Sequence, residues 1–192
     1  LFVFFDAGET FSLLPVIQKM ENEKLNYKIL LLGNGSVNAI AKEKYTTNII
    51  DIKKECSAHF ILAESTFRER EMNNKILQEV ANCYHPKKVI TGLVSRYQSQ
   101  LSEYYNKNST TQLIGYYDGF SLPELKILTP FQNSLNQIFV PSKNISEYLQ
   151  KKNIFANKIK VVGQPALDKF IEDANKIDSK EIKDKLNIKQ ET

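Results

Sequence analysis

The sequence contains no tryptophan, only two cysteines and two histidines, and no long apolar run. Cys56 and Cys83 form neither a disulfide framework nor a metal-binding pattern, which favours a reducing, cytoplasmic compartment. No apolar stretch approaches the roughly 20 residues that a transmembrane helix needs. We therefore expect no transmembrane segment, and peripheral membrane contact stays open.

A strong excess of one charge is also missing. The 26 lysines and arginines against 22 aspartates and glutamates give a net charge of +4, and these charges are spread along the chain. We therefore expect no nucleic acid partner. What is present is ordinary for a globular domain, with 42% hydrophobic and 25% charged residues. A chain of 192 residues can form one sizeable core and a linker.

Short β-rich runs alternate along the chain with segments of helical spacing. The candidate strands are residues 1–5, 27–32, 48–52, 87–91, 112–117, 137–140 and 158–162. Strands separated by helices imply right-handed crossovers and a mostly parallel sheet. Near-continuous apolar runs such as Leu1 to Phe5 are typical of strands that are buried on both faces. The pattern predicts a doubly wound α/β fold with about six to seven strands and helices on both faces.

Loops at the carboxyl ends of parallel strands form the ligand crevice of such a fold. No Gly-x-Gly-x-x-Gly fingerprint and no Gly-Lys-Ser/Thr triplet occurs, which disfavours NAD enzymes and P-loop NTPases. The pair Gly33 and Gly35 alone is equally typical of a tight turn. The ligand-binding candidates in these loops are Gly8, Thr10, Gly33, Asn34, Gly35, Gly92, Ser95, Gly119, Ser142 and Gln164.

Three side chains are candidates for acid–base catalysis. Asp118 lies at the end of a predicted strand and is followed by Gly119. There its carboxylate either acts in the ligand cleft or only stabilises a turn. Glu9 enters the first helix, where a carboxylate either acts as a base or stabilises the helix dipole. His59 is a candidate base in a loop-rich region, or else a packed or surface histidine. No metal site is predicted.

Four motifs carry a resemblance to a known group. These are Gly8-Glu9 followed by Pro15-Val16-Ile17, Ile114 to Phe120, Ile138 to Ser142, and Val161 to Asp168, of which the last is the most specific. Together they resemble the amino-terminal Rossmann-like domain of GT-B type glycosyltransferases and of the non-hydrolysing UDP-N-acetylglucosamine 2-epimerases. The Thr-Arg-Pro of the epimerase loop is absent, and Gly92-Leu93 stands where epimerases have Gly-Asp.

The resemblance implies one half of a two-domain enzyme. We expect residues 1–164 to form the Rossmann-like domain, and residues 165–192, with a helix over 178–188, to lead into a carboxy-terminal domain that this chain lacks. The chain begins inside an apolar run, which we also interpret as part of something longer. The implied partners are that missing domain, a nucleotide sugar and a hydroxyl acceptor, with no cofactor other than the sugar donor.

The favoured function is the acceptor-binding domain of a nucleotide-sugar-dependent glycosyltransferase in polysaccharide biosynthesis, inactive on its own. The alternatives are a UDP-sugar 2-epimerase-like enzyme and a non-catalytic Rossmann-like binding module. Binding of a UDP-sugar by a longer chain would separate the enzymes from the bare module.

Overall fold

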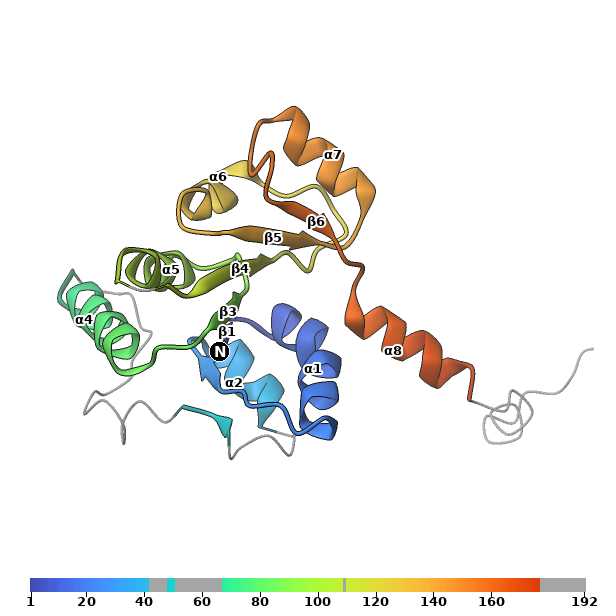
Figure 1. Cartoon of the computed structure of the whole chain (residues 1–192), viewed down its shortest axis with the longest axis horizontal. Coiled ribbons are helices and arrows are strands. Elements are labelled where there is room, and N and C mark those ends of the chain that lie inside the picture. Colours follow the sequence, from blue (N-terminus) through green and yellow to red (C-terminus); the bar gives the residue numbers. More distant parts are fainter. Residues whose placement is uncertain (42–47, 51–66, 109, 177–192) are drawn as a thin grey trace, which may run out of the picture.

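Six of the seven predicted strands pair into one sheet in this computed structural model, which describes residues 1–41, 48–50, 67–108 and 110–176. All neighbouring strands are parallel, and their order is β2-β1-β3-β4-β5-β6 (Figure 1). The strands are β1 (Phe2–Phe4), β2 (Ile29–Leu31), β3 (Lys88–Thr91), β4 (Gln112–Tyr116), β5 (Gln137–Val140) and β6 (Ile159–Val161). The predicted parallel α/β fold is confirmed.

Helices cover both faces of this sheet, as predicted. The helices are α1 (Ala7–Asn22), α2 (Asn34–Ile40), α4 (Phe67–Cys83), α5 (Arg96–Asn108), α6 (Leu125–Leu128), the 3₁₀ turn η2 (Thr129–Phe131), α7 (Lys143–Lys151) and α8 (Pro165–Ala174). Phe2 and Phe4 pack with α1 and α2 on one face, whereas Val3 joins the core under α4, α5 and α7 on the other. This alternation is the two-residue period of a strand buried on both sides.

The strand order places a topological switch point between β1 and β3. The chain leaves β1 for β2 on one side and later returns to β3 on the other side. Because all strands are parallel, their carboxyl ends lie at the same edge of the sheet. Ligands of open α/β sheets bind at that edge, close to the switch point.

The prediction of a third strand over residues 48–52 is wrong for residues 48–50, which the structure describes. Only an isolated bridge between Ile29 and Ile49 forms beside β2, supported by the bond from Ile50 N to Ile29 O at 2.8 Å. The run is short and contains Asn48 and Asp51, residue types that are depleted in strands. Residues 51 and 52 lie outside the described part of the chain.

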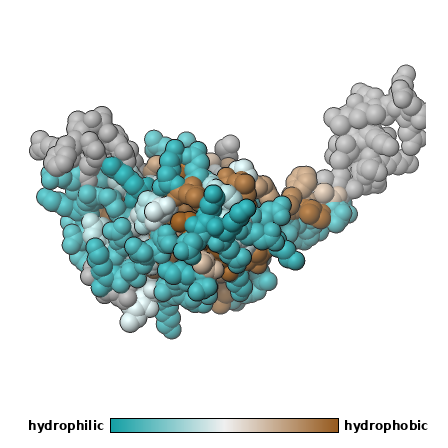
Figure 2. All heavy atoms as spheres, turned by 90° about the horizontal axis from the view of Figure 1, so that it is seen from above, coloured by the Kyte–Doolittle hydropathy of each residue, from teal (hydrophilic) through white to brown (hydrophobic). Residues whose placement is uncertain are grey.

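The last strand is less buried than its apolar sequence suggests. β6 is the edge strand next to β5, and Val161 and Val162 are 43% and 38% exposed. α8 begins immediately after Gln164 and packs on α1. Its apolar side chains Leu167 and Phe170 stay exposed, and Figure 2 shows apolar surface on the arm that α8 forms. The helix expected over 178–188 lies outside the described residues.

Candidate functional site

Loops that follow β1, β4 and β6 meet around the amino end of α1, at the carboxyl edge of the sheet. A β-carbon placed on Gly8 would lie 2.9 Å from Oδ2 of Asp118, so the loops after β1 and β4 are in direct contact. Gln164, which follows β6, donates from Nε2 to Oγ of Ser12 at 3.2 Å and to the Asp118 carbonyl at 3.0 Å. Residues 46 or more positions apart are thereby joined at one place.

Negative charge is concentrated at this meeting point. Partial burial raises the pKa of the Asp118 carboxyl, and the nearby charge of Asp6 raises it further. Burial also raises the pKa of the Tyr116 hydroxyl, with the charges of Asp118 and Asp168 adding to the effect. A carboxyl whose pKa is raised holds and releases a proton more readily near neutral pH than an ordinary aspartate. Proton transfer by Asp118 stays a prediction.

Glu9 lies deeper than Asp118, at the switch point itself. It forms a capping box with Asp6, whose Oδ1 accepts from Glu9 N at 3.0 Å, while Glu9 Oε1 accepts from the backbone of Phe5 and Asp6. Oε1 also accepts from Nε2 of Gln98 at 2.7 Å. The side chain is wholly buried, with 0% exposure. Glu9 thus faces protein groups and not the open edge.

Gly33 and Gly35 pack against the backbone of the neighbouring loop. A β-carbon on Gly33 would lie 2.1 Å from the Phe5 carbonyl oxygen, and one on Gly35 would lie 3.0 Å from Ala7 N. This close approach lets the β2–α2 turn support the start of α1. Asn34, between the two glycines, is exposed and begins α2.

This close approach predicts a large effect of Gly33→Ala. The added methyl group has no room beside a fixed carbonyl, so we expect a loss of about 3 kcal/mol of folding free energy, at the upper end for overpacking. The exposed neighbour Asn34 supplies the control, because Asn34→Ala should change stability by no more than about 0.5 kcal/mol. Urea unfolding of both variants measures the difference. Equal stabilities would show that the loops separate easily.

Four other candidates have clear local contacts. Ser142 caps α7 by accepting from Ile145 N at 3.4 Å, and Ser95 accepts from Tyr97 N at 3.1 Å at the start of α5. Thr10 Oγ1 donates to the Asp6 carbonyl at 2.5 Å. A β-carbon on Gly119 would lie 2.6 Å from the Tyr117 hydroxyl. Ligand binding by these residues stays a prediction, and His59 lies outside the described residues.

Three residues at the site were not predicted from the sequence. Gln98 forms a capping-box pattern with Ser95, three positions earlier, and this signal was available. Its bond to Glu9, across 89 positions, was not. Ser12 gave no sign of facing this edge, whereas Tyr116 lies near the end of the predicted strand that leads to Asp118, so its place near the edge could be inferred.

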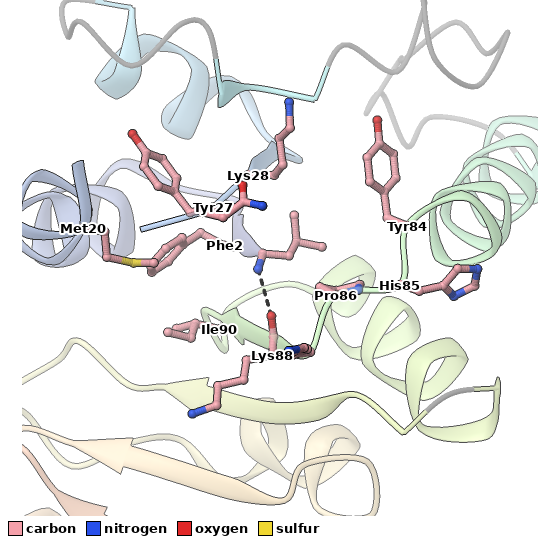
Figure 3. Close-up of a pocket in the computed structure, with 12 residues that line it drawn as sticks. Phe2, Met20, Tyr27, Lys28, Tyr84, His85, Pro86, Lys88 and Ile90 are labelled. Carbon is pink, nitrogen blue, oxygen red and sulfur yellow. Dashed lines mark hydrogen bonds between the residues drawn. The ribbon is translucent and has the colours of Figure 1, made fainter. Parts of the chain in front are cut away.

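A separate hollow of about 670 Å³ lies at the opposite edge of the sheet. Figure 3 shows the residues that line it. It lies at the amino ends of β1, β2 and β3, among the aromatic side chains of Phe2, Tyr27 and Tyr84. The amino group of Leu1 donates there to the Lys88 carbonyl at 2.8 Å. Because the strand ends that carry Asp118 and Gln164 face the other way, this hollow is not part of the candidate site.

Two features are absent from the described residues. Among them, no group of three or more histidine, cysteine, aspartate or glutamate side chains is arranged to hold a metal ion. No helix in the same ranges has the length and apolar character needed to cross a membrane.

No protein family and no curated protein matches the chain in sequence. Solved structures do match its fold. UDP-GlcNAc 2-epimerase from Neisseria meningitidis bound to UDP-GlcNAc has a TM-score of 0.64 at 14% identity, covering 97% of this chain and 52% of that one. The S. aureus MnaA–UDP co-structure has a TM-score of 0.64 at 16% identity, covering 98% and 51%. UDP-GlcNAc 2-epimerase from Methanocaldococcus jannaschii has a TM-score of 0.63 at 17% identity, and the match covers 87% of this chain and 46% of that one.

These comparisons establish a fold. The chain has the Rossmann-like α/β fold of one half of a GT-B-like protein, and it spans about half the length of the epimerase structures that it matches. The predicted resemblance to the amino-terminal domain of this group is confirmed.

The favoured function, an acceptor-binding domain of a glycosyltransferase, is contradicted. Several of the matching structures, including those from Neisseria meningitidis and Methanocaldococcus jannaschii, are UDP-N-acetylglucosamine 2-epimerases, which favours the epimerase alternative. The error arose because both enzyme groups share this domain, so the order of strands and loops did not separate them.

Proposed function

We propose that this chain is the amino-terminal half of a UDP-N-acetylglucosamine 2-epimerase-like enzyme, with its cleft at the carboxyl edge of the sheet. The observation that supports this most is the fold shared with epimerases over 87% to 98% of the chain. Two of the matched structures hold UDP-GlcNAc or UDP, and we extend that ligand class to this chain. A carboxy-terminal domain, to which residues 165–192 lead as a linker and helix, would complete the cleft. A cytoplasmic location is part of the proposal.

Asp118 is the residue to which we assign proton transfer. A 2-epimerase inverts carbon 2 of the sugar. The proton leaves carbon 2 while the electron pair of that bond forms a double bond to carbon 1 and UDP departs with its own bonding pair; UDP then adds back to carbon 1 and a proton adds to carbon 2 on the opposite face. One group accepts the proton and a group on the other face returns one, which leaves the proton count unchanged. Asp118 is half-buried at the open edge, and its raised pKa suits both roles. Gly8 gives its carboxyl room beside α1.

One departure favours a second candidate, a module that binds a UDP-sugar without turnover. Leu93 stands where the resemblance implies an aspartate, and it is 2% exposed within the hydrophobic core. The loop after β3 therefore presents no carboxyl from this position. Catalysis would then depend on Asp118 and on groups from the second domain.

The test uses the protein that carries this chain together with a second domain. Incubation with UDP-GlcNAc, followed by proton NMR of the sugar, should show the C2 epimer appearing. Residues 1–192 alone should show no turnover, because the sugar and the catalytic groups need one closed cleft. Binding without a C2 epimer would select the binding module. Absence of any UDP-sugar binding by the longer protein would overturn both candidates.

A further inference from the structure

Glu9 joins the two loops that flank the switch point. Its Oε1 accepts from Phe5 N in the loop after β1 and from Nε2 of Gln98, on α5, at 2.7 Å. Oε1 of Gln98 in turn accepts from Val94 N at 3.2 Å and from Ser95 N at 3.0 Å. One carboxyl and one amide therefore hold the start of α1 to the start of α5.

The second oxygen of this carboxyl is in a different environment. Glu9 Oε2 is buried and has no hydrogen-bond partner within the described residues. It lies against Gly92, where a β-carbon would come within 1.4 Å of it. A charged oxygen that is removed from water and receives no donor is strongly unfavourable, whereas an uncharged acid avoids most of that penalty.

The charges around Glu9 do not compensate for this burial. Asp6, at the cap of α1, is the charged side chain that acts on it, and its sign is also negative. From α5 the neutral amide of Gln98 faces it, and from the loop after β3 the backbone of Gly92. Burial outweighs the hydrogen bonds from Phe5, Asp6 and Gln98 and raises the pKa of Glu9 to about 8.

We propose that Glu9 is a positioning residue of the candidate site, which joins the loops after β1 and β3 as an uncharged carboxylic acid and whose deprotonation separates them. A negative Oε2 would be relieved by water, and water reaches it only if the loop at Gly92 moves away from α1. Glu9 itself touches no substrate. The inference rests on the proposed function only for the ligand that the site binds.

The experiment is a carbon-13 NMR titration of the side-chain carboxyls in residues 1–192, from about pH 5 to 9.5, without any ligand. Glu9→Gln assigns the Glu9 signal. The amides of Val94 and Ser95 report the loop. Glu124→Gln is the matched control, because Glu124 is an exposed glutamate of another loop, paired with Lys126 at 2.8 Å.

We expect the Glu9 carboxyl to titrate well above the exposed glutamates. In the wild type, the Val94 and Ser95 amide signals should shift with the same midpoint as the Glu9 carboxyl. In Glu9→Gln these amide signals should not shift over this pH range. Glu124→Gln should leave that shift intact. Titration of Glu9 together with the exposed glutamates, or loop amides that stay fixed while it titrates, would overturn the proposal. If Glu9→Gln folds poorly, the Glu9 carboxyl signal can be assigned in the wild type by through-bond correlation with the Glu9 backbone, so the test can still be carried out.

A second measurement separates this inference from the proposed function. If the longer protein binds UDP-GlcNAc, its affinity for that ligand should fall by about fivefold or more between about pH 7 and 9, which is the lower end of the range for coupled sites. In Glu9→Gln the affinity should not fall over this pH range. An affinity that falls equally in both proteins would overturn the positioning role. Failure to bind UDP-GlcNAc at all would overturn the proposed function and leave the ligand-free titration as the test of Glu9.

Discussion

Glu9→Gln should make the protein more stable at alkaline pH and should change its stability little below about pH 5. The pKa of Glu9 rises from an ordinary value of 4.5 to about 8 in the folded chain. Between these values the folded state holds a proton that the unfolded state has released, so wild-type stability falls as pH rises and levels off above the folded pKa. Glutamine has nearly the same shape and no charge, so it removes this loss.

The size of the effect follows from the same linkage. A tenfold change in proton affinity corresponds to about 1.4 kcal/mol, so the gain at pH 9 is of the order of 4 kcal/mol. Urea unfolding at a series of pH values measures it. Other titrating groups, Asp118 among them, are present in both proteins and cancel. Glu124→Gln should give a curve parallel to the wild type, and a parallel curve for Glu9→Gln would refute the buried acid.

The sequence predicted the sheet well because its signals are local. An apolar run such as Ile29 to Leu31, ended by a glycine, has few alternatives to a buried parallel strand. The prediction failed at residues 48–50, the described part of the third predicted strand, where only Ile49 forms a bridge at the edge of the sheet. Pairing there depends on the few contacts that one neighbouring strand offers, and local propensity does not report them.

The site was predictable only as a set of loops. That Asp118 follows a strand could be inferred, but not that its carboxyl lies against Gly8 of α1. Likewise, the glutamate of the first helix was visible, whereas its burial under Gly92 and its bond to Gln98 depend on how three loops pack. Long-range contacts of this kind decide whether a carboxyl meets solvent, a ligand or the core. Sequence spacing contains no record of them.

Asp118→Asn should lower kcat/KM of the longer protein for UDP-GlcNAc epimerisation by about 100-fold or more, which is typical for loss of a general acid or base. Stability should change little, because asparagine has nearly the same volume. In the folded chain, burial and the charge of Asp6 raise the pKa of Asp118, so its negative charge is disfavoured there. Because Asp118→Asn removes that charge, any change in stability at neutral pH should be an increase.

Asp168→Asn is the matched control for this experiment. Asp168 is an exposed carboxylate in the first turn of α8, and its charge also acts on Tyr116. If only the total negative charge at this edge mattered, the two variants would lose activity alike. If Asp118 transfers the proton, its variant alone should lose most of kcat while KM changes less. A stable Asp118→Asn protein with unchanged kcat/KM would leave Asp118 as a residue that forms the turn before Gly119.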